Sequence, residues 1–412
     1  MKIYNLIYRP VTTLVGVLLY PIALFNKRLR EHTGSMTPKL ANSVWIHASS
    51  VGEVNGIRPF IERIVALYPT ENIVVTTMTT TGKEIAQKIS PKLITSLVPF
   101  DSPIFVRSFL NHINPKLLVI AETELWFSMI NECYKRQIPI MLANARLSDK
   151  SYPKYLKHKA LFSSLLTKLK IVVAQSELDK TRFIQLGAKE VIVGGNIKFS
   201  VNLQDYNSAE IRAKYGYKSD DLIITWGSSR PGEEELIIKV YNTLLFDYPN
   251  LKLIIVLRHI QRIKELLPNL SSQDFTTFSD FTPNKKILLV DAMGVLNQFY
   301  ACSDIAIVGG SFFNFGGHNP LEPAYYSKPI IMGNYHSSCL DSVEKLREQN
   351  AIIVSSESEL LADLRKLLSN SSLRNEMGMQ AKKTLKLHSH AIENNFSHFQ
   401  QLFSQSIYNN KS

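Results

Sequence analysis

The sequence has few cysteines and lacks the common nucleotide and metal motifs. Cys133, Cys302 and Cys339 are its only cysteines, and no two of them form a CxxC pair. This pattern argues against a disulfide framework and a zinc site, and it fits a reducing cytosol. No P-loop occurs, and no G-x-G-x-x-G follows the first expected strand, which argues against ATP and NAD. No Asp-x-Asp motif occurs where a nucleotide-bound magnesium would be expected, and the neighbours of the histidines form no coherent ligand set, so we expect no metal.

The sequence also lacks a long uninterrupted hydrophobic run. Its most apolar stretch, 11–25, is short for a full span, which needs about 20 residues. Arg9 precedes the stretch and Lys27, Arg28 and Arg30 follow it, but no small-residue cleavage site does. We therefore favour a membrane anchor, spanning or interfacial, with the rest of the chain in the cytoplasm. The alternative is an amphipathic helix that docks on the protein itself.

What the sequence does contain is typical of a basic globular protein. Its 412 residues suffice for two domains, with 45% hydrophobic and 20% charged residues. The net charge is +12, which indicates an anionic partner: nucleic acid, an anionic membrane surface or a phosphorylated substrate.

Short apolar segments alternate with helical segments along most of the chain, a pattern typical of parallel Rossmann-type sheets. Ligands of such sheets bind at the carboxyl ends of the strands. Expected strands are 44–48, 73–77, 93–98, 117–121, 138–143 and 171–174 in the first half, and 222–229, 251–257, 287–290, 305–308 and 329–333 in the second.

A glycine-rich run from Gly309 to Ala324 follows the expected strand 305–308. Asn319 and Pro320 suit a helix start, and Glu322 favours the positive end of the helix dipole. A strand, a glycine loop and a helix N-terminus together can hold a nucleotide phosphate on free N–H groups. The alternative is a tight turn that binds nothing.

Two Rossmann-like halves with a phosphate loop in the second indicate an α/β fold of GT-B architecture, in which two domains face a central cleft. A two-domain dehydrogenase or ligase has the same layers. The expected parts are a membrane-anchor helix at 1–30, an acceptor-binding domain at 31–205, a donor-binding domain at 206–385, and a C-terminal helix at 386–412 that packs back on the first domain.

Six motifs in order resemble those of the 3-deoxy-D-manno-octulosonic acid (Kdo) transferase family, and the resemblance covers essentially the whole chain. They are 47–53 (HASSVGE), 122–126 (ETELW), 144–148 (NARLS), Arg182-Phe183 before 186–188 (LGA), 195–199 (GNIKF) and the glycine-rich run. The resemblance implies inverting, metal-independent transfer of Kdo from CMP-Kdo to a lipid A precursor in lipopolysaccharide core biosynthesis. It also implies the cytoplasmic face of the inner membrane and no cofactor or nucleic acid.

The resemblance assigns roles to three residues of the first half. Glu53 resembles the general base, although Ser50 and Glu53 also fit a capping box. Glu122 resembles a second essential carboxylate, with Glu124 as the alternative. Lys198 resembles a residue that stabilises developing charge, although most lysines are solvated.

The resemblance makes 206–385 the CMP-sugar-binding domain and places the donor residues there. Arg258 is either a phosphate ligand or half of a structural salt bridge, and Glu322 resembles an acceptor for the ribose hydroxyls. The family's Gly-Ser-Thr-His turn reads Gly-Ser-Ser-Arg at 227–230, so the details of donor binding differ here. The residues expected to bind CMP are Arg258, His259, Met293, Gly294, Val295, Gly310, Ser311, Asn319, Pro320, Leu321 and Glu322.

Two other functions remain open from the sequence. The first is another GT-B enzyme that uses a different nucleotide sugar, such as a UDP-sugar, and a different lipid acceptor. The second is a basic binding protein for nucleic acid or lipid at a membrane surface, although no recognised nucleic-acid motif occurs.

Overall fold

The computed structural model describes residues 8–201, 203–270, 274–387 and 389–409. The chain divides into two compact units, each described here by itself. The first unit contains Met1–Ser200 and His388–Ser412, and the second contains Val201–Leu387. The expected boundaries were 205 and 385.

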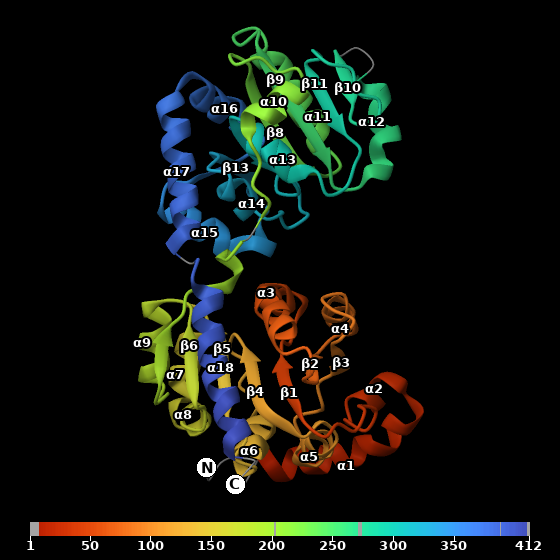
Figure 1. The fold of residues 1–412 in the computed structure, drawn as a ribbon, viewed down its shortest axis with the longest axis vertical. Coiled ribbons are helices and arrows are strands. Elements are labelled where there is room, and N and C mark those ends of the chain that lie inside the picture. The colour runs from red at the N-terminus through yellow and green to blue at the C-terminus, as the bar shows by residue number, and fades with distance from the viewer. Residues whose placement is uncertain (1–7, 202, 271–273, 388, 410–412) are drawn as a thin grey trace. The chain divides into compact units, whose positions relative to one another are not determined.

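The first unit is built on a parallel sheet of seven strands in the order β3-β2-β1-β4-β5-β6-β7 (Figure 1). Most of the strand residues are apolar and buried, as in parallel strands covered on both faces, whereas β7 is only partly buried. They are β1 (Ser43–His47), β2 (Ile73–Thr77), β3 (Ile94–Leu97), β4 (Pro115–Ala121), β5 (Ile140–Ala145), β6 (Ile171–Ala174) and β7 (Val191–Val193).

Helices cover both faces of this sheet and form two apolar layers. The helices α3, α4 and α18 pack on one face, and α5, α6, α8 and α9 pack on the other. The helices of the unit are α1 (Arg9–Phe25), α2 (Lys27–Glu31), α3 (Val51–Leu67), α4 (Thr80–Gln87), α5 (Pro103–Ile113), α6 (Phe127–Lys135), α7 (Tyr152–Lys157), α8 (Lys159–Leu166), α9 (Glu177–Gln185), the 3-10 turn η2 (Ile197–Phe199) and α18 (Ala391–Asn409).

The C-terminal helix α18 belongs to the first unit although it follows the second in sequence (Figure 1). Phe399 is fully buried, and its ring lies 5.9 Å from the rings of both Phe60 and Tyr68. The Asn395 side chain accepts a 3.0 Å hydrogen bond from the N–H of Asn144 at the end of β5. The helix is therefore part of this unit's core. The expected segment 386–412 also includes 388 and 410–412, which lie outside the described residues.

The N-terminal helix α1 packs on α5 and exposes most of its apolar side chains. The ring of Tyr20 stacks on that of Phe105 at 6.3 Å, and Ala23 is buried. Residues 1–7 of the expected anchor lie outside the described residues. Within the part of the chain that is described, no helix has both the length and the hydrophobicity needed to cross a membrane. The exposed apolar side chains of α1 are Val11, Leu14, Val15, Val17, Leu18, Tyr20, Ile22 and Phe25.

The second unit repeats this design, with a parallel sheet in the order β10-β11-β9-β8-β12-β13-β14. The helices α11, α12, α16 and α17 pack on one face, and α10 and α13 pack on the other. Its elements are β8 (Leu222–Ser229), β9 (Leu251–Leu257), β10 (Phe275–Thr277), β11 (Ile287–Val290), β12 (Ile305–Val308), β13 (Ile330–Gly333), β14 (Ile352–Ser355), α10 (Ser208–Lys214), α11 (Glu233–Leu244), α12 (Ile263–Leu270), α13 (Leu296–Cys302), α14 (Leu321–Tyr325), α15 (Leu340–Glu348), α16 (Leu360–Ser369), α17 (Ser371–Leu387) and the 3-10 turns η3 (Ile260–Arg262) and η4 (Ser337–Cys339).

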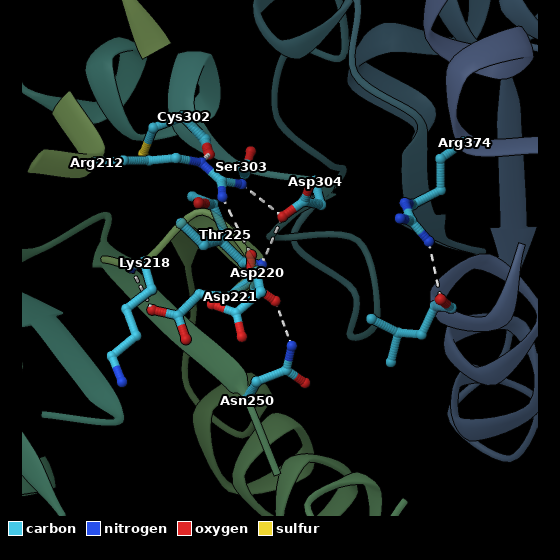
Figure 2. A network of polar contacts seen from close by, with 12 residues as sticks. Arg212, Lys218, Asp220, Asp221, Thr225, Asn250, Cys302, Ser303, Asp304 and Arg374 are labelled. Carbon is cyan, nitrogen blue, oxygen red and sulfur yellow. Dashed lines mark hydrogen bonds and ion pairs between the residues drawn. The ribbon is translucent and has the colours of Figure 1, made fainter. Parts of the chain in front are cut away.

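A polar network fastens α10 to the amino ends of β8 and β12 (Figure 2). The Arg212 guanidinium donates to Asp304 at 2.7 Å, to the carbonyl of Cys302 at 3.0 Å and to the carbonyl of Asp221 at 3.1 Å. Asp304 also accepts from the N–H of Ile223 at 2.8 Å. These contacts of Arg212 and Asp304 are made within the protein, and they fix the amino edge of the sheet.

Candidate functional site

In each sheet, the chain reverses its direction of winding beside the first strand. In the first unit, β1 lies between β2 and β4; in the second, β8 lies between β9 and β12. Loops that leave two such neighbouring strands on opposite sides open a crevice at their carboxyl ends, where ligands of parallel sheets bind. Glu53 and Glu122 follow β1 and β4, whereas Arg230 and Gly310 follow β8 and β12. The predicted residues therefore lie where the topology favours a site.

Glu53 lies in the first turn of α3, and its carboxylate is held by the turn before it. The carboxylate accepts from the N–H of Ser49 at 2.8 Å and from the Ser50 hydroxyl at 3.0 Å. Ser50 Oγ in turn accepts from the N–H of Glu53 at 3.2 Å, so the capping alternative describes real contacts. Burial and the nearby charge of Glu124 raise the pKa of Glu53 to about 7, while these hydrogen bonds oppose the shift. The carboxylate is oriented and also has a pKa suited to taking up a proton near neutral pH.

Glu122 follows β4 directly and is paired with Lys198. Lys198 Nζ lies 2.9 Å from Glu122 Oε1, and both side chains are partly exposed. Glu122 has φ 52°, in the left-handed region that a residue with a side chain seldom adopts. Such strain is often found at functional sites, where the surrounding structure imposes it. Two residues that are distant in sequence thus form one charged pair beside the Glu53 turn.

Gly56 makes room for the side chain of Lys198. A Cβ at position 56 would lie 2.6 Å from Lys198 Cε and 3.4 Å from its Cγ. Because Gly56 is one helical turn after Glu53 in α3, the lysine stem passes along the helix that carries the candidate base. The pattern of the sequence gave no sign of this requirement, since the glycine lies inside a helix and Lys198 is 142 positions later.

Asn144 positions the segment that carries Lys198. Its Oδ1 accepts from the N–H of Ile197 at 2.9 Å, and its own N–H donates to Asn395 of α18. Asn144 is fully buried and has φ 52°. Asn196 Oδ1 then accepts from the N–H of Lys198 at 3.0 Å. The family motifs include Asn144, but the part played by α18 through Asn395 was not predicted.

Glu124, the alternative second carboxylate, is bound differently from Glu122. Its Oε2 accepts from the indole N–H of Trp126 at 2.7 Å. The Trp126 ring also meets the edge of the His47 ring at 5.7 Å. His47 is fully buried, its Nδ1 lies 3.0 Å from the Thr76 hydroxyl, and burial lowers its pKa to about 4. Glu122 is therefore the carboxylate of the two that pairs with a cation.

In the second unit, the glycine-rich loop folds around the buried carboxylate of Glu233. This carboxylate accepts from the N–H of Gly310 at 2.8 Å, Ser311 at 3.0 Å and Phe312 at 3.1 Å, and from the N–H of Arg230 at 2.9 Å. The expectation that the N–H groups of Gly310 and Ser311 are free for a phosphate is therefore wrong. Sequence reasoning missed Glu233 because acidic residues in the first turn of a helix are usually exposed.

The run from Asn319 to Glu322 begins α14, one residue later than expected. Pro320 precedes the helix, and Asn319 Oδ1 accepts from the N–H of Leu321 at 3.1 Å. The helix has five residues, so its dipole is smaller than we assumed. Burial raises the pKa of Glu322, and the Arg258 charge opposes that shift. The charges of Glu322 and Arg258 therefore attract each other at this edge of the sheet.

Basic side chains gather around the same loop. Arg230 donates to His259 Nε2 at 2.6 Å, and its guanidinium lies 5.3 Å from the centre of the Phe315 ring. Burial and the charges of Arg258, Arg230 and His259 lower the pKa of His318 to about 4. Arg230 Nε and His318 Nε2 are buried with no hydrogen-bond partner among the described residues. This set can accept an anionic ligand.

The three residues expected near the cytosine of CMP, 293–295, follow β11. Met293 is 62% exposed, Gly294 is exposed with φ 81°, and Val295 packs on the apolar layer that contains Phe299. The order of the sheet places β11 next to β9, so these residues lie at the same carboxyl edge as Arg258.

A metal site in either unit would need several ligating side chains close together. No group of three or more His, Cys, Asp or Glu arranged to hold an ion occurs in the described ranges.

Two solved structures share the fold over most of the chain at low identity. A UDP-N-acetylglucosamine 2-epimerase matches with a TM-score of 0.54 and 13% identity over 90% of this chain and 97% of that one. A glycosyltransferase from Rickettsia africae matches with a TM-score of 0.50 and 15% identity over 89% and 98%. The chain thus consists of two parallel-sheet α/β units that resemble those of GT-B glycosyltransferases.

Sequence relatives carry the comparison further. A bifunctional glycosyltransferase/methyltransferase of Fusobacterium nucleatum is 38% identical over 335 residues, 78% of this chain but 51% of that longer protein. A 3-deoxy-D-manno-octulosonic acid transferase of Haemophilus influenzae is 34% identical over 335 residues, 78% of each chain, and one of Rickettsia felis is 33% identical over 360 residues, 85% of this chain and 76% of that one. The family model described as 3-deoxy-D-manno-octulosonic-acid transferase (kdotransferase) matches residues 27–201. The chain belongs to this Kdo transferase family of glycosyltransferases.

Proposed function

We propose that this protein transfers Kdo from CMP-Kdo to a lipid A precursor, with inversion and without a metal or cofactor. Family membership supports the Kdo group. The observation that carries the mechanism is Glu53, an oriented carboxylate whose pKa is raised to about 7 at the carboxyl end of β1.

Glu53 is the general base of the proposed reaction. Its carboxylate takes the proton from an acceptor hydroxyl as the hydroxyl oxygen attacks the anomeric carbon of Kdo. The bond between that carbon and the phosphate oxygen breaks, and CMP leaves with its electron pair. Attack on the face opposite the leaving group inverts the configuration. Glu122 orients Lys198, whose ammonium stabilises negative charge that develops during the transfer.

The second unit holds CMP in this proposal. Arg230 and Arg258 bind the phosphate of CMP, and Glu322 accepts hydrogen bonds from the ribose hydroxyls. Residues 293–295 lie near the cytosine ring. Arg230 Nε and His318 Nε2, which have no hydrogen-bond partner in the described part of the chain, support an anionic ligand here. The Gly310 and Ser311 N–H groups shape the loop around Glu233 and do not bind phosphate directly.

The helix α1 gives the protein its place at the cytoplasmic face of the inner membrane. Its exposed apolar side chains suit insertion into the interface, and Arg28 and Arg30 beyond its end are exposed and suit anionic headgroups. An acceptor embedded in the same membrane would then be within reach.

The test is an assay with CMP-Kdo and a tetraacylated lipid A precursor, with the products counted by mass spectrometry. The expected result is a mass increase of one or more Kdo groups that depends on both substrates and survives EDTA. The other candidate, a transferase for another nucleotide sugar, predicts tighter binding of UDP than of CMP in a calorimetric titration. Tighter binding of UDP, together with no Kdo product, would overturn the proposal.

A further inference from the structure

The first unit has a large cavity that the proposed reaction does not use. Its volume is about 1110 Å³, and it lies at the amino ends of β4, β5, β6 and β7. Residues just before or at the start of these strands line it, among them Lys116, Pro139, Lys170 and Lys189. Glu53 follows the carboxyl end of β1, so the cavity is at the opposite edge of the same sheet.

The lining of this cavity is strongly basic. Six basic side chains and one acidic side chain, Glu190, contribute to it. Cations at the end of a helix are favoured by its dipole, and this accounts for two of the six, which lie at the end of α6. Lys168 lies just beyond the end of α8, where the dipole of that helix also favours a cation. The remaining three lie at or just before the start of a strand. The six are Lys116, Lys135, Arg136, Lys168, Lys170 and Lys189.

Neighbouring groups hold part of this basic set in place. Lys168 Nζ donates to Asn131 Oδ1 at 2.6 Å and lies 6.0 Å from the centre of the exposed Tyr134 ring. Lys135 Nζ donates to Glu132 at 2.6 Å, and Arg136 donates to the side chain of Asn111. Binding to cations that are already oriented costs less side-chain entropy than gathering free ones.

Of the other three lysines, Lys116 is paired with Glu71 at 3.5 Å, and the remaining two are available to a ligand. The side chains of Lys170 and Lys189 are exposed and have no hydrogen bond or ion pair in the part of the chain that the structure describes. Burial and the like charge of Lys135 lower the pKa of Lys168, so a bound anion would favour the charged form of this lysine. A cavity of this volume can hold a small-molecule ligand, since such sites measure about 300–1,000 Å³.

We propose that this basic cavity binds a ligand with phosphate groups, at a site separate from the one that carries Glu53. The recognising chemistry is multiple ammonium groups and one guanidinium around a space lined by polar side chains. A soluble phosphorylated compound and the headgroup of an anionic phospholipid both offer such phosphates. The experiment below separates the two sources.

The test compares two double variants with the same change of charge. Lys170→Gln with Lys189→Gln removes the two unpaired cavity lysines, whereas Lys88→Gln with Lys92→Gln removes two exposed lysines near β3, away from the cavity. Binding of inorganic pyrophosphate is measured by calorimetry with excess CMP present, so that any phosphate site in the second unit is occupied. Binding to phosphatidylcholine vesicles with and without phosphatidylglycerol is measured by sedimentation.

The cavity variant is expected to bind one of these probes more weakly by about fivefold for each lysine removed. The control variant should bind like the wild type, and both should unfold at the wild-type temperature because all four side chains are exposed. Weaker binding of pyrophosphate identifies a soluble ligand, and weaker binding of anionic vesicles alone identifies a headgroup. The proposal is overturned if neither probe binds, or if the control pair loses as much affinity as the cavity pair.

Discussion

Each unit has a seven-stranded parallel sheet whose winding reverses beside its first strand, but the carboxyl edges of the two sheets carry opposite chemistry. After β1 and β4, the first unit carries Glu53 and Glu122, with Lys198 paired to the latter. After β8 and β12, the second unit carries Arg230 and a glycine loop closed on Glu233. The order of the strands thus sets where a ligand site can form, at the carboxyl edge of the sheet. The side chains of the loops decide whether that site suits proton transfer or anion binding.

A partly buried glutamate in the first unit and a fully buried one in the second show the same contrast. Glu53 has two donors, and its pKa is raised to about 7, so its proton can exchange during a reaction. Glu233 accepts four backbone N–H groups, which leaves little capacity for a ligand. The Glu53 carboxylate is therefore suited to proton transfer, whereas the Glu233 carboxylate is suited to holding the glycine-rich loop.

The strongest test of this contrast is Glu53→Gln. The amide keeps the shape of the side chain but cannot take up a proton, so kcat should fall by about 10³-fold, or about 4 kcal/mol. In the wild type, kcat/KM should fall as the pH drops below about 7, because the protonated base is inactive. A pH profile of initial rates measures both effects. An unchanged rate in the variant would remove Glu53 from the mechanism.

The same substitution has a consequence for stability that does not depend on activity. The folded-state pKa of Glu53, about 7, is above the ordinary glutamate pKa of 4.5, so between these pH values the folded state binds more protons than the unfolded state. Wild-type stability should therefore fall relative to Glu53→Gln as the pH rises from about 4.5 to about 7. Thermal unfolding of both proteins across this range measures the difference.

Glu233→Gln tests the second unit and should have the next largest effect. An amide nitrogen would face backbone N–H donors that now meet carboxylate oxygens, at a cost of about 2–3 kcal/mol in unfolding free energy. The misfolded loop should also weaken CMP binding. Glu235→Gln, an exposed position in the same helix, is the matched control. Equal stability and CMP affinity in both variants would show that the loop does not need Glu233.

Glu122→Gln and Glu124→Gln sharpen the assignment within the first unit. Loss of the Glu122 charge releases Lys198 and should reduce kcat by about 10²-fold, or about 2.7 kcal/mol at most. Glu124 is bound to Trp126 instead, so its amide should reduce kcat less. Steady-state kinetics of the two variants decide the order. A larger loss in Glu124→Gln would exchange the two roles.

Gly56→Ala should have the smallest effect and is the most specific test. The added methyl group meets Lys198 Cε, so the ammonium must move away from Glu122 and kcat should fall by about tenfold, or about 1.4 kcal/mol. Alanine favours the helix, so thermal stability should not fall by the same amount. Gly52→Ala in the same helix is the control, since its nearest contact would be Ser50 Oγ at 3.7 Å. Equal rates in both variants would contradict the role of Gly56.

The sequence alone was sufficient for the fold class and for most of the strands. Buried parallel strands are continuous apolar runs, and β1, β9 and β12 have that form. The strands β7, β10 and β14 were missed because they are short and only partly buried, so their composition differs little from that of loops. The family motifs likewise singled out Glu53, Glu122 and Lys198, which the structure brings close together in the first unit.

Only the tertiary structure decided which groups meet there. Residues from α3, β4, β5, η2 and α18 are brought together at the edge of the first sheet, and no local pattern encodes the match between Gly56 and Lys198 or between Asn144 and Asn395. The partners of Glu233 come from a loop 77 to 79 positions away. Local periodicity reports which face of an element is buried, whereas contacts between distant loops depend on how the strands are ordered in the sheet.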